Sequence, residues 1–397
     1  MTIKNFSYHT IRHAMYNRYY DLVIADTLRS AALSMVALFV PLFLLEKGYK
    51  IITVAVYYLC FYILSIIGHY ALLKVINKIG IKKSLIISYA AEIIFCFVLY
   101  NYEKISEAFN NNIYFIFLII PAVIATVFYW TAHHIYFFAS SHSKNEGAKL
   151  GFLYAIPRVL AIFTPFLGGF LITAFGFKSV FVISIILLIF ASSVLFLSRS
   201  IEARIDISYG KIFDFFRDNK NWIYFIEGIN FFAAGIVWPV YMFIMSVNFL
   251  SIGFIYIFAN GAHAISAYIS GKISDKIGTR TIGRVGVIGH SLSLALRAFS
   301  EKVLSMSLFL TLGGLSNAAM MVALESAFYK HSHENIGSAI MNREFYMHLG
   351  RIFMVLLFLF CLLIYNIHIS LVIILLSAAF ATFMLNFIIK KDKVIID

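Results

Sequence analysis

Ionisable and polar side chains occur inside the long apolar stretches of this chain, and their types are suited to binding a solute or a proton. An ionised group in a bilayer core costs at least about 2.5–3.5 kcal/mol, so each should face a polar cavity or a partner of opposite charge. The side chains predicted to line a substrate cavity are Arg29, Trp130, His134, Arg158, Glu227, Asn230, Glu325 and Arg351.

Histidine and glutamate exchange protons near neutral pH more readily than other side chains once their surroundings are tuned. The predicted proton-coupling groups are therefore Glu227, Glu325, His133 and His134. Neighbouring helical residues point about 100° apart, so only one of the two histidines is expected to face the cavity directly. An interfacial hydrogen bond is the alternative role for either histidine.

The sequence offers alternative partners for the charged residues inside the spans. Arg29 either pairs with Glu227 across the molecule or is satisfied by Asp26, one helical turn away. Glu92 and His290 are more readily explained as structural hydrogen-bonding groups than as coupling groups.

A second charged group, formed by Arg343, Glu344, His348 and Arg351, spaces most of its members along one helical face. Arg343 and Glu344 are open to a simpler reading as an ion network at the membrane edge. Arg351 lies too deep for that unless its long side chain reaches back to the interface.

The elements that must position these residues are membrane helices. Apolar residues make up 61% of the chain and charged residues 13%, against about 45–50% and about 25% in soluble proteins. Windows of about 20 apolar residues predict twelve spans, near 22–45, 51–73, 83–101, 112–138, 149–175, 179–198, 220–246, 249–270, 283–300, 303–329, 338–365 and 368–389.

The basic residues predict how these spans are oriented. Most of the 32 lysine and arginine residues fall in the loops on one side and at both termini, which places the termini in the cytoplasm by the positive-inside rule. The net charge of +13 is then explained by anionic lipid at that face. Nucleic-acid binding is excluded, because no basic soluble module is present.

The second half of the chain repeats the first at a constant offset. The segment LKVINKIGIK, which begins at Leu73, realigns on GKISDKIGTR, which begins at Gly271, and at the same offset Pro41 falls on Pro239. A half-chain repeat in a membrane protein predicts two similar helix bundles with a central seam, an architecture typical of alternating-access carriers.

The segment after the eighth span has the pattern Gly-x-x-x-Asp-Lys-x-Gly-x-Arg, formed by Gly271, Asp275, Lys276, Gly278 and Arg280. With twelve spans, a six-plus-six repeat and a basic central linker, the chain resembles the major facilitator superfamily (MFS). Gly271 is expected to allow close helix approach and Gly278 a tight turn. The resemblance implies that this loop acts as a conformational latch.

The first half departs from the loop pattern, because Leu73 replaces the first glycine and Asn77 the aspartate. Its latch is expected to be weaker. In the fifth span the segment TPFLGG, from Thr164 to Gly169, is similar to a pattern of proton-coupled exporters in the superfamily. Small residues there predict close helix packing, and the similarity favours export slightly.

The resemblance implies an all-α membrane protein with twelve transmembrane helices in two pseudo-symmetric six-helix bundles. The predicted divisions are an N-terminal segment 1–20, a first bundle 21–198, a linker 199–219, a second bundle 220–390 and a tail 391–397. The predicted location is the inner (cytoplasmic) membrane, and the predicted functional unit is a monomer.

These features predict a secondary transporter of a small solute that works by alternating access with proton coupling. The alternative is a transporter-like membrane receptor, sensor or scaffold without flux. No enzyme or ATP-binding signature is present, and no cofactor is expected. The three cysteines have no metal-type spacing, so no metal site is predicted.

Overall fold

The computed structural model describes residues 8–109, 111–140, 147–198, 219–331 and 336–391, and the described residues outside short loops are helical. The first half of the chain contains α1 (Tyr8–Val36), α2 (Val40–Glu46), α3 (Ile51–Ile79), α4 (Ile81–Tyr100), α5 (Tyr102–Ala108), α6 (Asn111–Ser140), α7 (Gly147–Phe175) and α8 (Phe177–Leu197). The second half contains α9 (Asn219–Phe232), η1 (Ala233–Val237), α10 (Trp238–Ile244), α11 (Phe249–Ile277), α12 (Thr279–Arg297), α13 (Val303–His331), α14 (Ile336–Ile364) and α15 (Ile367–Lys391).

The helices are long enough to cross a bilayer. Ten helical segments of the described chain have the length and hydropathy of membrane spans, and Val159–Phe175 is a shorter apolar one. The predicted ninth span coincides with α12, which does not meet the hydropathy criterion because it carries Arg280, Arg284, His290 and Arg297. The predicted fold class, an all-α MFS-type membrane protein, is confirmed.

The sequence repeat reappears in the helix boundaries. Helices α2, α3 and α4 begin at residues 40, 51 and 81, and α10, α11 and α12 begin at 238, 249 and 279, which is the same offset each time. Proline stands in the first turn of α2 and of α10, where its missing N–H costs no helical hydrogen bond. Each proline marks a break in a membrane-crossing segment.

The turns repeat as well. Gly80 and Gly278 both have a φ of +85° at the junction of two long helices. Gly48 has a φ of +85°, and the equivalent turn of the second half has Ser246 with a φ of +60°. A residue with a β-carbon is strained in this left-handed region, so Ser246 carries a strain that its counterpart avoids.

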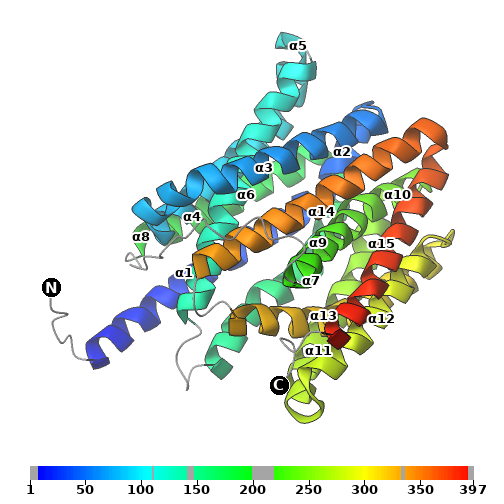
Figure 1. Ribbon diagram of the computed structural model, residues 1–397. Helices are drawn as coiled ribbons and strands as arrows, with labels where there is room; N and C mark the ends of the chain where they lie inside the picture. Colours follow the sequence, from blue (N-terminus) through cyan, green and yellow to red (C-terminus); the bar gives the residue numbers. More distant parts are fainter. Residues whose placement is uncertain (1–7, 110, 141–146, 199–218, 332–335, 392–397) are drawn as a thin grey trace.

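Within each half the helices pack on their near neighbours, and two pairs of long helices make most of the described contact between the halves. In the first half α1 packs against α7 and α8, and α4 packs against α6 and α8; in the second, α13 packs against α11 and α12, and α14 against α9. Helix α7 lies along α11, and α3 lies along α14 (Figure 1). The predicted domain boundaries stay a prediction, because residues 199–218 lie outside the described part.

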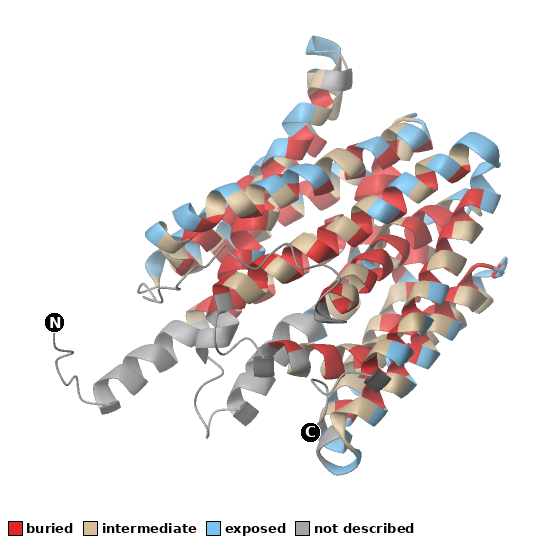
Figure 2. Ribbon diagram, in the orientation of Figure 1, coloured by how far each residue is buried: buried red, intermediate tan, exposed pale blue. Residues whose placement is uncertain are grey.

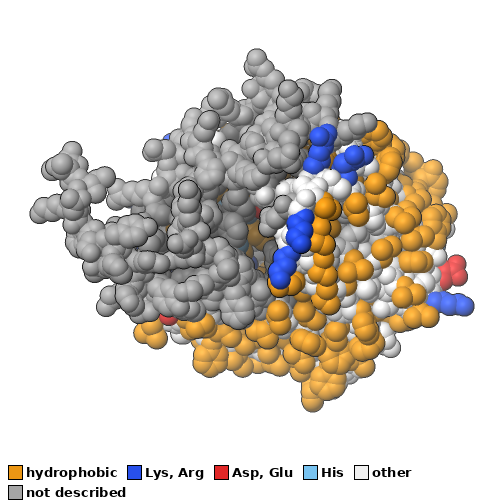
Figure 3. Space-filling model, turned by 90° about the horizontal axis from the view of Figure 1, so that it is seen from below, with side chains coloured by type: hydrophobic (Ala, Val, Ile, Leu, Met, Phe, Trp, Pro, Cys, Tyr) orange, Lys and Arg blue, Asp and Glu red, His pale blue; other side chains and the backbone are white. Residues whose placement is uncertain are grey.

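Polar side chains inside and apolar side chains outside are the pattern of a chain surrounded by lipid. Large hydrophobic side chains such as Phe163, Phe190 and Leu363 are more than half exposed, and hydrophobic side chains cover the lower and right-hand edges of the molecule seen from below (Figure 3). Buried residues line the helix faces that point into the bundle (Figure 2). The exposed hydrophobic surface is therefore a membrane-facing one.

A loop ion pair ties three segments together at the side of the bundle where α5 lies, here called the α5 side. Glu103 of α5 accepts hydrogen bonds from Lys47 Nζ at 2.7 Å and forms an ion pair with Lys178 Nζ at 3.0 Å. The hydrogen bond from Lys47 and the second one from Lys178 lower the pKa of Glu103 to about 2. The side where α1 begins and α15 ends is called the terminal side.

Candidate functional site

Most of the ionisable residues in the described interior of the bundle gather in three clusters, and Arg297, His290 and Arg351 lie outside them. The first cluster lies within the first half, on α1, α4 and α6. Arg29 Nε donates to Glu92 Oε1 at 2.9 Å and Oε2 at 3.1 Å, and the Arg29 guanidinium carbon lies 3.1 Å from the centre of the Tyr129 ring. Both charged side chains are less than a tenth exposed.

The Arg29–Glu92 pair answers two questions that the sequence left open. Arg29 does not pair with Glu227, because Glu227 lies beside Arg343 in the second half. Glu92 has a structural ion-pairing role within its half, as expected, but its partner was not foreseen. The two residues are 63 positions apart and on helices that meet only in the folded chain.

Asp26 and His133 extend the first cluster through Tyr129. The Tyr129 hydroxyl donates to Asp26 Oδ1 at 2.6 Å and lies 3.3 Å from His133 Nδ1. The cluster thus holds one arginine, two carboxylates and a half-buried histidine. The cluster thus has two carboxylates to one guanidinium.

The second cluster lies within the second half, where Arg343 of α14 bridges two carboxylates. Arg343 Nη1 donates to Glu325 Oε2 at 3.0 Å, and its Nη2 donates to Glu227 Oε1 at 3.2 Å. The Arg343 side chain is 7% exposed and forms an ion network with these two carboxylates; its expected place at the membrane edge stays a prediction. The charge balance is again one arginine to two carboxylates.

The third cluster joins the two halves and consists of His69 on α3, His134 on α6, and Glu344 and His348 on α14. The Nε2 atoms of His69 and His134 each lie 3.5 Å from a Glu344 carboxylate oxygen, and His348 Nε2 lies 3.8 Å from one. All four residues are buried. We call this group the interhalf cluster.

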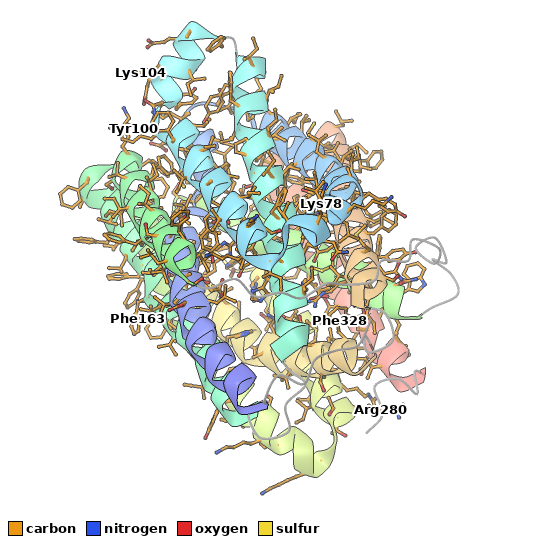
Figure 4. The ribbon with its side chains drawn as sticks, turned by 90° about the vertical axis from the view of Figure 1, so that its left-hand side faces the viewer. Lys78, Tyr100, Lys104, Phe163, Arg280 and Phe328 are labelled. Carbon is orange, nitrogen blue, oxygen red and sulfur yellow. The ribbon has the colours of Figure 1, made fainter. Side chains whose placement is uncertain are left out.

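Phe328 of α13, labelled in Figure 4, contacts one residue of the second cluster and one of the interhalf cluster. The guanidinium carbon of Arg343 lies 4.8 Å from the Phe328 ring centre, and the His134 ring centre lies 5.9 Å from it. Sequence reasoning missed both His69 and Phe328. A lone histidine or phenylalanine in an apolar helix gives no signal of what it faces.

The remaining predicted cavity residues are dispersed. Arg351 is buried beside Tyr62 and Phe231, with its guanidinium carbon 4.2 Å from the Phe231 ring centre. Asn230 accepts a hydrogen bond from Thr382 at 2.6 Å. Trp130 is 40% exposed and stacks on His134.

Arg158 lies outside the residues whose side chains are described. The predicted set is therefore not gathered in one place within the described residues.

The structure describes only part of the predicted latch. Gly278 adopts a φ of +85° between α11 and α12, as the tight turn requires. A β-carbon on Gly271 would meet no described atom within 4 Å, and the expectation that Gly271 permits close helix approach stays a prediction. Lys276 is exposed, Arg280 is half-buried, and the side chain of Asp275 lies outside the described part.

The paired glycines of the TPFLGG segment do pack closely, as predicted. A β-carbon on Gly168 would lie 2.7 Å from the backbone oxygen of Met35 on α1. One on Gly169 would clash with the backbone oxygen of Phe249, the first residue of α11. This segment therefore holds α7 against its own half and against the other half.

Comparisons with known proteins agree with this architecture. A family model described as Major Facilitator Superfamily matches residues 22–353. The chain is similar in structure to a bacterial homologue of the iron transporter ferroportin in its outward-facing state, with 17% identity, a TM-score of 0.64, and coverage of 94% of this chain and 98% of the other. No curated protein matches it.

Two further solved structures have the same fold. A bacterial metal transporter is 14% identical with a TM-score of 0.64, and coverage is 94% of this chain and 98% of that one. The nucleoside transporter NupG (D323A mutant) is 12% identical with a TM-score of 0.67, and coverage is 94% and 99%. Identities this low show the fold and no substrate.

Long apolar helices, a half-chain repeat and ionic clusters enclosed between the helices define a multi-pass membrane transporter rather than an enzyme. The family follows from the match over most of the chain. This protein belongs to the Major Facilitator Superfamily.

Proposed function

We propose that the protein is a secondary active transporter that moves a small solute across the cytoplasmic membrane by alternating access, driven by protons. It works as a monomer with both termini in the cytoplasm, and the similarity of the TPFLGG segment to a pattern of proton-coupled exporters slightly favours export. Arg29, Arg158 and Arg351 favour an anionic or zwitterionic solute. The loop from Gly271 to Arg280 serves as its latch.

The observation that carries proton coupling is the arrangement of one arginine between two carboxylates. With Glu325 protonated, Arg343 and Glu227 form a neutral one-to-one pair; with Glu325 ionised, the cluster carries one net negative charge. The Glu325 side chain is 31% exposed and that of Glu227 11%. Glu325 is thus the carboxylate that water reaches more easily, and it is our proton site.

The remaining proton candidates fit supporting roles. Glu227 keeps its ion pair with Arg343 when Glu325 is protonated. His133 lies next to the carboxylate of Asp26 through Tyr129, and His134 lies next to Glu344. Each histidine therefore lies where a proton taken up from water meets a negative charge.

The test is solute flux in proteoliposomes at two pH values, with a ligand first found by thermal shift against a metabolite and drug collection. Glu325→Gln, which mimics the protonated side chain permanently, is expected to abolish pH-driven flux and to leave solute exchange intact. Glu301→Gln is the matched control, because Glu301 is exposed.

Undiminished pH-driven flux in Glu325→Gln excludes Glu325 as the proton site. A ligand that shifts the melting temperature of the wild-type protein with no flux in either direction contradicts transport and favours a receptor or sensor.

A further inference from the structure

The interhalf cluster contains more ligand atoms than its hydrogen bonds use. His69 Nε2 and His348 Nε2 are buried and have no hydrogen-bond partner. Both point at the same carboxylate oxygen, Glu344 Oε2, from 3.5 Å and 3.8 Å. The three ligand atoms lie within 4.8 Å of one another.

The two nitrogen–oxygen distances, 3.5 Å and 3.8 Å, are longer than hydrogen bonds and close to those between ligands that share a metal ion. Nitrogen–oxygen hydrogen bonds are about 2.7–3.2 Å long. Ligand atoms about 2.0–2.1 Å from one tetrahedral ion are about 3.3–3.4 Å apart. Two unpartnered imidazole nitrogens and a carboxylate are also the usual ligand chemistry of zinc-like ions.

From this arrangement we propose that His69, Glu344 and His348 bind a divalent transition-metal ion between the two halves of the protein. Sequence spacing predicted no metal site, because one ligand is on α3 and the other two are on α14. This inference goes beyond proton-driven transport and does not depend on it.

The surroundings orient the ligands. Thr131 Oγ1 lies 3.3 Å from His69 Nδ1, and an Nδ1–H that donates to this hydroxyl leaves the His69 Nε2 lone pair free for the ion. Glu344 and His348 are one helical turn apart and so project from the same face of α14. His134 Nε2 lies 3.5 Å from Glu344 Oε1 and steadies the second carboxylate oxygen.

Arg351 is the group that opposes a cation here. Its Nη1 lies 3.4 Å from His348 Nδ1, and a guanidinium only donates hydrogen bonds. Binding of an ion at His348 Nε2 requires the imidazole proton on Nδ1, so this contact must give way, and the Arg351 charge further weakens the site while Glu344 offsets it. Imidazole ligands favour zinc, cobalt, nickel and iron over calcium and magnesium, which prefer oxygen ligands. The site is therefore expected to bind these transition-metal ions in preference to calcium and magnesium.

A metal ion at this place links α3 of the first half to α14 of the second. The ligand set is complete only while these helices are in contact, so the ion stabilises this arrangement over any in which they separate. The consequence is a metal-dependent clamp on the carrier.

The direct test uses purified full-length protein, free of its affinity tag, titrated with cobalt(II) chloride and with zinc chloride. Wild-type protein is expected to bind one equivalent of Co²⁺ with the intense visible absorption of a four-coordinate ion, and Zn²⁺ is expected to displace it and raise the melting temperature. His69→Asn and Glu344→Gln are each expected to weaken binding at least about tenfold.

Two controls keep the test decisive. His368→Asn removes an exposed histidine at the α5 side and is expected to bind Co²⁺ like the wild type. Thr131→Val keeps the shape of the side chain and all three ligands, yet is expected to weaken binding about tenfold through His69. Wild-type protein that takes up no Co²⁺, or equal binding by His69→Asn and Glu344→Gln, refutes the site.

A separate measurement of the distance between the two halves tests the clamp. Spin labels on cysteines introduced at Lys83 and Thr281, which are exposed at the starts of α4 and α12 in the first and second halves, report the separation of the halves. Zn²⁺ is expected to narrow the distance distribution toward its short end in the wild-type background and to leave it unchanged with Glu344→Gln. A distribution unchanged by bound Zn²⁺ refutes the clamp.

Discussion

Removing the negative charge at position 92 is expected to leave Arg29 buried without its ion-pair partner. Glu92→Gln keeps the size of the side chain and an acceptor oxygen but not the charge. The Arg29 side chain is 9% exposed, and the other carboxylate nearby, Asp26, already accepts the Tyr129 hydroxyl. The variant therefore isolates the contribution of charge to a packed, hydrogen-bonded site.

The magnitude follows from how buried ion pairs behave. Breaking one by removing a single partner costs about 3–5 kcal/mol, and replacing both partners by apolar residues is often neutral or stabilising. The expected loss of stability is at the lower end of this range, about 3 kcal/mol. The reason is that glutamine retains an acceptor oxygen and that the ring of Tyr129 lies 3.1 Å from the guanidinium carbon. The unfolding equilibrium then shifts by about a hundredfold.

Reversible unfolding in mixed micelles of increasing dodecyl sulfate content measures this loss. The double variant Arg29→Met with Glu92→Met is expected to regain most of the lost stability, and Glu301→Gln, at an exposed site, is expected to match the wild type. A loss below about 1 kcal/mol in Glu92→Gln refutes our reasoning on the buried charge. So does a double variant that is no more stable than Glu92→Gln.

Three further outcomes are expected. The hydrogen bond from Lys47 lowers the pKa of Glu103 to about 2. Ionised Glu103 therefore stabilises the folded protein fully at pH values above its unfolded pKa of about 4.3, and this stabilisation is lost as the pH falls toward 2. Wild type and Glu103→Gln should thus differ in melting temperature at neutral pH, by the equivalent of at most about 1 kcal/mol for so exposed a pair, and converge in acid; a constant difference contradicts this. Gly169→Val should destabilise the protein by about 1–3 kcal/mol in micelle unfolding, because its side chain meets the backbone of Phe249, and wild-type stability in this variant would show that α7 and α11 do not pack there. Ser246→Gly should raise the melting temperature, by the equivalent of about 0.5–1 kcal/mol, because Ser246 has a φ of +60°; a lower melting temperature would mean that the serine side chain is needed.

The sequence by itself determined the class of fold and much of its regularity. Composition and apolar windows identified the membrane helices, and the repeat located Pro41 opposite Pro239 and Gly80 opposite Gly278, where the helix breaks and turns occur. These features are local: each depends on a short stretch of chain and on backbone preferences that act wherever the stretch is placed.

Only the tertiary structure decided which charges meet. Arg29 had two predicted partners on the basis of spacing and symmetry and took a third, Glu92, from another helix. His69 gave no signal at all, yet it faces Glu344 from the other half of the chain. The physical reason is that an isolated polar residue in a uniformly apolar helix has no periodic pattern around it, so its direction is decided by how the helices rotate and pack together.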